Sequence, residues 1–477
     1  MTSDVLLYLD GKWVLGSGGR TLDVVNPANE EVAGTVAVAE RADLDVALAD
    51  AARGFEIWKH TSPVERGKVL RKAADLLRER AEAIMPVLTE QQGKTHFESR
   101  YEVNASADSF DWFAEEARRA YGRVVPPRSD GVYQLVLKEP IGPVAGFVPW
   151  NFGMGQAARK VGAALAAGCS IILKGPEETP SCCAYLVEAL VDAGLPTGVI
   201  SLVFGMPSEI SEYLIPTPVI RKISFTGSSA VGKHLAAMAG AHMKPITMEL
   251  GGHSPVIVTA DVDIEQVAAM LTVAKFRNAG QVCVAPTRFL VEEDIYEPFV
   301  ETFSRKASEV KVGVGSEDGV QMGPLANVRR LHAMESLIAD AVERGGEVRT
   351  GGKRIGNLGN FFEPTVLTGV PNEARAMNEE PFGPLAMVRP YSDLGEAIAE
   401  ANRLDYGLAS YAFTKSAETA SRLTGAVQSG MISINGFGLA FPELPYGGIK
   451  DSGYGSEGGL EAIEAFLTTK TVSHTVA

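Results

Sequence analysis

Apolar residues recur at helical spacing between about residues 42 and 118, and further along they gather into short continuous runs. In the first region, Ser62 and Pro63 form a cap and start signal for an amphipathic helix. From about 141 to 260, short apolar runs alternate with helical stretches: VAGFVPW, SIILKG, GVISLVFG, RKISFTG and PITMEL. This alternation predicts βαβ units and an open parallel sheet that binds its ligand at the carboxyl ends of the strands.

Two further regions complete the predicted α/β fold. The segment GRVVPPRSDGVYQLVLKEP, at about 120–140, is punctuated by Pro and Gly around an alternating stretch, which predicts an extended hairpin. A plain exposed hairpin with no further role is the alternative. A second α/β block extends from about 260 to 440.

Composition narrows the class of protein. The 477 residues are 45% hydrophobic and 22% charged, as in an ordinary globular protein of two or three domains. A net charge of -15 disfavours nucleic acid and anionic membranes as partners. No apolar stretch reaches the roughly 18 residues that span a bilayer, and the first residues do not form a signal peptide. We therefore expect a cytoplasmic protein with a small-molecule substrate.

Cysteine and histidine patterns exclude most metal chemistry. The chain has no CxxC or HExxH motif, so no metal site is predicted. Of its cysteines, Cys169, Cys182 and Cys183 lie in apolar patterns typical of buried thiols. Cys283, in FRNAGQVCVAPTR, follows a helical pattern and small polar residues, which favours a thiol presented on a loop. A buried, inert thiol is the alternative.

Two further segments end predicted strands at the expected ligand edge. Glu249 closes the strand PITMEL, where it is either a solvated carboxylate or a general base whose ionisation is hindered by apolar neighbours. The segment FTGSSAVGKH, with Gly227, Gly232 and Lys233, nearly matches a phosphate-binding loop. His234 replaces the hydroxyl residue that would hold Mg²⁺, which disfavours nucleotide hydrolysis.

Six motifs in order make the chain resemble the aldehyde dehydrogenase superfamily along its whole length. They are PWNF (149–152), KGPE (174–177), FTGSSAVG (225–232), MELGG (248–252), GQVC (280–283) and EEPFGP (379–384). The resemblance implies a Rossmann-like cofactor domain, an α/β catalytic domain and a small β excursion for oligomerisation. By position it implies an NAD-binding domain at 1–119 and 141–251, a catalytic domain at 252–445, and oligomerisation segments at 120–140 and 446–477. Homodimers or homotetramers are then expected.

The resemblance also implies catalytic roles. Cys283 is the expected nucleophile on the aldehyde, and Asn151 with the Cys283 backbone N–H is the expected oxyanion hole. Glu249 is expected to activate the water that hydrolyses the thioester, and Lys160 to help relay protons. A surface cation is the alternative for Lys160. Thr468 occupies the position at which many members of the family have a second glutamate, so a relay through two glutamates is not expected.

The cofactor motifs predict NAD, with NADP as the alternative. The Glu177 carboxylate is expected to bind the ribose hydroxyls and to repel a 2′-phosphate. The implied contacts to the adenosine ribose, the pyrophosphate and the nicotinamide riboside involve Trp150, Lys174, Glu177, Gly227, Ser228, Glu380 and Phe382.

The prediction of the substrate depends on two arginines. Arg159 and Arg277 resemble the carboxylate-binding pair of succinate-semialdehyde dehydrogenases, which predicts succinate semialdehyde or a related substrate. The alternative is that both pair with internal carboxylates. Ala440 replaces a serine of that branch, and Gly153 and Gly175 also depart from the usual motifs.

Three other functions stay open. One is a coenzyme A-acylating dehydrogenase of the same fold, against which the presence of Glu249 argues. The others are a phosphate-loop nucleotidase and a noncatalytic oligomeric binding protein.

Overall fold

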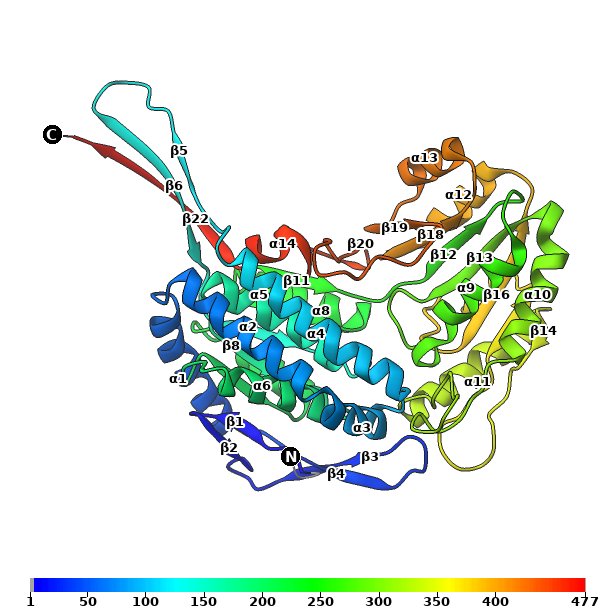
Figure 1. Ribbon diagram of the computed structural model, residues 1–477, viewed down its shortest axis with the longest axis horizontal. Helices are drawn as coiled ribbons and strands as arrows, with labels where there is room; N and C mark the ends of the chain where they lie inside the picture. Colours follow the sequence, from blue (N-terminus) through cyan, green and yellow to red (C-terminus); the bar gives the residue numbers. More distant parts are fainter. Residues whose placement is uncertain (1–3, 477) are drawn as a thin grey trace.

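The computed structural model describes residues 4–476, which form two α/β bodies and a projecting β arm (Figure 1). The predicted α/β class is confirmed. The first sheet has the order β2 (Lys12–Val14), β1 (Leu7–Leu9), β9 (Ile200–Val203), β8 (Ile171–Lys174), β7 (Val144–Phe147), β10 (Lys222–Thr226), β11 (Ile246–Glu249) and β21 (Gly453–Tyr454). Strands β9, β8, β7, β10 and β11 are parallel, as their continuous apolar runs predict.

Helices cover this sheet and connect its parallel strands. The connecting helices are α5 (Gly153–Ala167), α6 (Ser181–Asp192), α7 (Pro207–Leu214) and α8 (Ser229–Ala241). An N-terminal helical layer comprises α1 (Arg41–Trp58), α2 (Pro63–Glu79), α3 (Ala81–Gln92) and α4 (His96–Glu116). Ser62 caps α2 as predicted, because its side chain accepts a hydrogen bond from the Glu65 N–H at 3.2 Å. A Cβ at Gly162 of α5 would lie 2.6 Å from Phe113, so this glycine allows α5 to pack closely on α4.

The second sheet has the order β14 (Glu347–Thr350), β15 (Thr365–Thr368), β16 (Leu385–Tyr391), β13 (Pro286–Glu292), β12 (Ser254–Val258), β18 (Ala409–Phe413) and β19 (Met431–Ile434). Its helices are α9 (Ile264–Phe276), α10 (Tyr296–Ser308), α11 (Val328–Glu343), α12 (Leu394–Asn402) and α13 (Ala417–Ala426). Short 3₁₀ turns are η1 (Arg277–Gly280), η2 (Glu293–Ile295) and η3 (Arg375–Met377). Each sheet has its own large apolar core.

The predicted hairpin at 120–140 is confirmed and forms the arm with the C-terminal strand. Strand β6 (Val132–Pro140) pairs antiparallel with both β5 (Arg123–Val125) and β22 (Leu467–Thr475), away from the main body (Figure 1). Strands β3 (Thr21–Val25) and β4 (Val32–Ala37) form a separate hairpin. A short ladder of β17 (Tyr406–Gly407) with β20 (Ile449–Lys450) and the helix α14 (Gly459–Glu464) complete the chain. Within 446–477, β21 joins the first sheet and β22 the arm.

Candidate active site

Glu249 ends β11 at the carboxyl edge of the first sheet, opposite Thr226 of β10. Its side chain is 1% exposed, so the solvated alternative is wrong. Neither carboxylate oxygen has a hydrogen-bond partner among the described residues. Burial raises the pKa of Glu249 to about 8, the nearby Glu457 carboxylate adds to the rise, and Lys160 opposes it. A carboxyl group with such a pKa can act as a general base near neutral pH.

Cys283 follows α9 and η1 on a loop, as predicted from its polar neighbourhood. Asn278 and Ala279 adopt left-handed φ angles of 49° and 51°, which turn the chain sharply before the thiol. The Cys283 Sγ lies 3.0 Å from the Tyr446 hydroxyl. Desolvation raises the pKa of the Cys283 thiol well above its usual range, and the Glu249 carboxylate adds to this rise. Cys169, Cys182 and Cys183 are fully buried, as predicted.

Asn151 lies after β7 and contacts the loop that bears Cys283. Its side-chain amide donates to the Gln281 carbonyl at 3.1 Å, which brings the predicted oxyanion donor next to the thiol loop. Its own carbonyl accepts hydrogen bonds from Lys94 Nζ at 2.9 Å and from the Asn278 amide at 3.2 Å. Asn151 is therefore fixed in position both by its backbone carbonyl and by its side-chain amide.

The sequence offered no signal for the group that holds Asn151 in place. Lys94 and Glu102 form a buried ion pair, and the Lys94 ammonium also lies 4.4 Å from the Phe152 ring centroid. The Glu102 carboxylate accepts from the Met154 N–H at 2.9 Å, at the beginning of α5. These contacts fix the Asn151 loop to the start of α4.

Lys160 is 1% exposed, so the surface alternative is wrong. Its ammonium donates to Thr226 Oγ1 at 2.6 Å and pairs with the Glu457 carboxylate. A second glutamate does lie in the site, although not at Thr468. Thr468 lies exposed in β22, opposite Glu139, whereas a second buried glutamate, Glu457, lies beside Lys160. The site thus has two carboxylates and one ammonium at the end of β10 and β11.

Glu177 is held in place. Lys174 lies 2.7 Å from its carboxylate, which also accepts the Gly205 N–H at 2.9 Å. A carboxylate fixed at the end of a parallel strand fits the hydroxyls of a ribose. A Cβ at Gly175 would lie 2.4 Å from Phe204. The glycine that departs from the usual motif here therefore allows the Phe204 ring to pack closely against the backbone. A Cβ at Gly153 would likewise lie 2.3 Å from Cys182 Sγ.

The remaining predicted cofactor residues lie around the same edge. Ser228 precedes the first turn of α8, and its side chain makes no capping hydrogen bond, which leaves it available to an anion. The Trp150 and Phe382 rings meet edge to face at 5.5 Å. Glu380 accepts the Gly252 N–H at 3.0 Å, and burial raises its pKa to about 7. Acidic groups, aromatic rings and a helix N-terminus together fit a dinucleotide.

The segment from Gly227 to Lys233 does not form a phosphate-binding cradle around its lysine. Lys233 lies on α8 and is exposed, where it pairs with Asp451 at 2.5 Å. A Cβ at Gly227 would lie 2.5 Å from the Phe225 ring, which explains this glycine by packing. The contacts of Lys233 therefore give no support to a nucleotidase.

The two predicted substrate arginines do not pair with carboxylates in the described part of the chain. Arg159 donates to the Ala440 carbonyl at 2.6 Å, and its guanidinium lies 4.5 Å from the Tyr446 ring centroid. Arg277 lies 5.8 Å from the Phe152 ring centroid. The alternative of internal ion pairs is therefore wrong, and both cations retain donors for a substrate anion.

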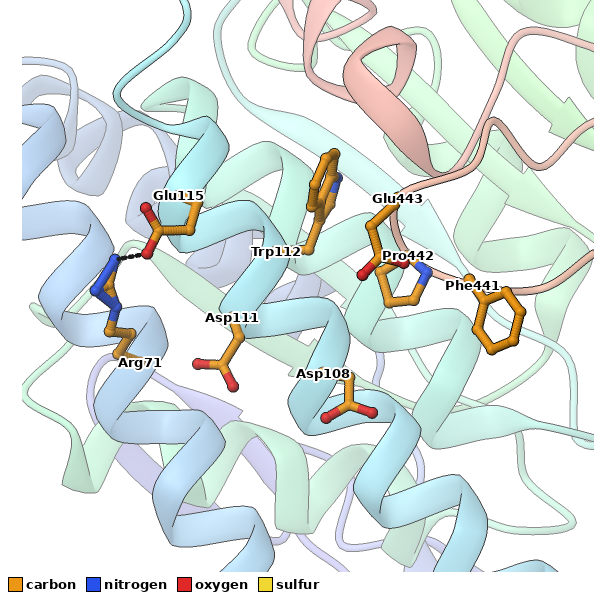
Figure 2. Close-up of a pocket in the computed structure, with 8 residues that line it drawn as sticks. All are labelled: Arg71, Asp108, Asp111, Trp112, Glu115, Phe441, Pro442 and Glu443. Carbon is orange, nitrogen blue, oxygen red and sulfur yellow. Dashed lines mark hydrogen bonds and ion pairs between the residues drawn. The ribbon is translucent and has the colours of Figure 1, made fainter. Parts of the chain in front are cut away.

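A separate pocket of about 410 Å³ lies between α2, α4 and the loop at 441–443 (Figure 2). Arg71 pairs with Glu115 on one side, and Asp108 and Asp111 both pair with Arg78. Neither Cys283 nor Glu249 lines it. Three of its acidic side chains, Asp108, Asp111 and Glu115, therefore already have ionic partners.

Residues 4–476 contain no candidate for a metal site or a membrane span. No cluster of His, Cys, Asp or Glu side chains there has the arrangement of a metal site. No helix in that range is long and apolar enough to cross a membrane.

The chain is similar to known proteins over nearly its whole length. The chain is 46% identical over 464 residues to the 4-(hydroxymethyl)benzenesulfonate dehydrogenase TsaD1 of Comamonas testosteroni, covering 97% of each chain. It is 38% identical to the glutarate-semialdehyde dehydrogenase of Pseudomonas putida, covering 97% of this chain and 96% of the other.

Solved structures agree with the sequence relatives. The crystal structure of succinate-semialdehyde dehydrogenase from Burkholderia pseudomallei matches with a TM-score of 0.97 and 37% identity, covering 99% of this chain and 98% of that one. The profile described as the aldehyde dehydrogenase family matches residues 13–472. The chain therefore belongs to the aldehyde dehydrogenase family and is an oxidoreductase that acts on aldehydes.

Proposed function

We propose that this protein oxidises an aldehyde with a distal anionic group, such as succinate semialdehyde, to the carboxylic acid, and that Cys283 is its nucleophile. The observation that carries the choice of substrate is the pair of arginines without carboxylate partners. Arg159 stacks on Tyr446, whose hydroxyl touches Cys283, so an anion on Arg159 would lie a short distance from the thiol. The names of the relatives support an anion as well, because each describes a substrate with a sulfonate or a carboxylate.

In the first half of the reaction, the Cys283 thiolate adds to the aldehyde carbon and forms a thiohemiacetal. Asn151 and the Cys283 N–H stabilise the oxyanion, a contribution of about 3 to 4 kcal/mol for each donor. When bound, the nicotinamide supplies the acceptor for the hydride that leaves this carbon. A thioester on Cys283 remains.

In the second half, Glu249 removes a proton from water, which attacks the thioester and releases the acid. Its burial and lack of hydrogen-bond partners support this role, because they leave the carboxylate free to accept the proton. Lys160 and Glu457 lie beside it, where the Lys160 ammonium can donate a proton and the Glu457 carboxylate can accept one for onward proton transfer.

NAD is the proposed cofactor, held by the residues predicted from the motifs: Trp150, Lys174, Glu177, Gly227, Ser228, Glu380 and Phe382. The fixed Glu177 carboxylate supports NAD, because a 2′-phosphate would meet its negative charge. Lys174 balances part of that negative charge, so we propose a moderate preference for NAD over NADP.

The arm of β5, β6 and β22 supports assembly as a homodimer or homotetramer. Tyr121, Val124 and Tyr133 expose 72%, 73% and 58% of their surface on and beside it. A partner subunit would bury them. Light scattering of the purified protein tests this directly, and a monomer mass would refute it.

The substrate proposal is tested by comparing kcat/KM for succinate semialdehyde and butanal, which have equal chain length. We expect the anionic substrate to be preferred by at least about tenfold, and Arg159→Met to remove the preference while butanal turnover persists. Equal values in the wild type would refute the choice of substrate. The assay is repeated with coenzyme A, and turnover that depends on coenzyme A would instead favour the acylating alternative.

A further inference from the structure

The Tyr446 hydroxyl lies at hydrogen-bond distance from the Cys283 thiol. The distance from Cys283 Sγ to the hydroxyl oxygen is 3.0 Å. Tyr446 belongs to none of the motifs that identify the site. Its ring is 4% exposed, and its carbonyl accepts the Glu457 N–H at 2.8 Å, so the hydroxyl is held in position.

We propose that Tyr446 is a catalytic residue that donates a hydrogen bond to Cys283 Sγ and stabilises the thiolate. The proposal rests on the proposed role of Cys283 as nucleophile. In the thiol form, either group can be the donor. In the thiolate form only the phenol O–H can donate, and a hydrogen bond to an ion is stronger than one between neutral groups. The contact therefore favours ionisation of the sulfur.

The other surroundings of the sulfur oppose the thiolate. Desolvation by the surrounding protein opposes the thiolate most, and the Glu249 and Glu380 carboxylates add to this effect when they are ionised. Burial, and next the Cys283 charge, raise the pKa of Tyr446 well above its usual range, so the phenol keeps its proton at neutral pH.

Arg159 strengthens the phenol as a donor. Its guanidinium lies 4.5 Å from the Tyr446 ring centroid, which places a positive charge against the aromatic face. A cation at this distance withdraws electron density from the ring and makes the O–H more acidic. The substrate-binding arginine and the nucleophile are thus linked through a single ring.

The test measures alkylation of Cys283 by iodoacetamide as a function of pH, without cofactor or aldehyde. The thiolate forms a bond from sulfur to carbon and iodide leaves, so the rate follows the ionised fraction. The other cysteines are at most 1% exposed. The matched control is Tyr391→Phe, which removes the hydroxyl of another buried tyrosine, one that donates to the Val258 carbonyl.

We expect Tyr446→Phe to raise the midpoint of the alkylation profile by about one pH unit, which is a tenfold lower rate at neutral pH. Tyr391→Phe should leave the midpoint unchanged. The ultraviolet absorbance of the thiolate, taken as the difference from Cys283→Ala, gives a second measure of the same midpoint. An unchanged or lowered midpoint in Tyr446→Phe overturns the proposal.

The failure of the proposed function has a different signature. If Cys283 is not the nucleophile, Cys283→Ala retains aldehyde oxidation, whatever the alkylation profile shows. If Cys283 is the nucleophile and Tyr446 has no part in its ionisation, Cys283→Ala is inactive while Tyr446→Phe has the profile of the wild type.

Discussion

Glu249→Gln is expected to make the stability of the protein less sensitive to alkaline pH. Burial raises the pKa of Glu249 from 4.5 to about 8, so the folded state holds this proton more tightly than the unfolded chain. The stabilising contribution is fully present below about pH 4.5 and is lost as the pH rises through about 8. Each unit of pKa corresponds to about 1.4 kcal/mol, so full ionisation costs about 5 kcal/mol.

The measurable window lies between pH 6 and pH 9. Over this range, the free energy of unfolding of the wild type should fall by about 3 kcal/mol relative to Glu249→Gln, in which the site carries no charge. Urea unfolding, followed by tryptophan fluorescence and circular dichroism at one protein concentration, measures this difference. Glu335→Gln changes an exposed glutamate on α11 in the same way and serves as the control.

The control should have the same pH dependence as the wild type. If Glu249→Gln has that dependence too, the carboxyl of Glu249 is not held neutral by its surroundings. Glu249 would then not be poised to act as a base near neutral pH.

Three further predictions test separate parts of the site. Cys283→Ala should abolish aldehyde oxidation with NAD binding retained, whereas the control Cys169→Ala should keep activity. Steady-state rates measure the oxidation and cofactor titration measures the binding. Near wild-type turnover in Cys283→Ala would refute the assignment of Cys283 as the nucleophile. Glu177→Ser should reduce the preference for NAD over NADP by about tenfold in kcat/KM, and an unchanged ratio would show that its carboxylate does not discriminate. Lys94→Met should lower kcat at least about tenfold with little change in KM, because the Asn151 loop loses its ionic anchor; an unaltered kcat would remove Lys94 from the support of Asn151.

Some parts of the site were predictable because they lie within short segments. Glu249 closes an apolar strand, and Cys283 follows a run of small polar residues, so their local patterns already indicate their positions. The alternating strands and helices from 141 to 260 likewise fix the sheet edge at which both lie. These patterns depend on neighbours in sequence, which a single chain displays directly.

Other parts depend on contacts between distant segments. Lys160 and Glu457 are separated by 297 positions, and Cys283 and Tyr446 by 163, and no periodic pattern links either pair. The burial of Glu457 beside Lys160 could not be predicted, because the segment from 455 to 470 contains several glutamates and no periodic pattern indicates which of them is buried. The burial of Lys94 and Glu102 could not be predicted either, because each buried charge is tolerated only when it forms an ion pair with the other.

Oxidation through a thioester on Cys283 can be tested by trapping that thioester. Glu249→Gln should still acylate but hydrolyse slowly, so it is mixed with succinate semialdehyde and NAD, quenched in acid, digested and analysed by mass spectrometry. Oxidation through this thioester predicts a succinyl group on the peptide that contains Cys283, formed together with one equivalent of NADH, and no adduct in the Cys283→Ala form of the same variant. Formation of NADH with no acyl group on Cys283, or with the acyl group on another residue, would contradict it.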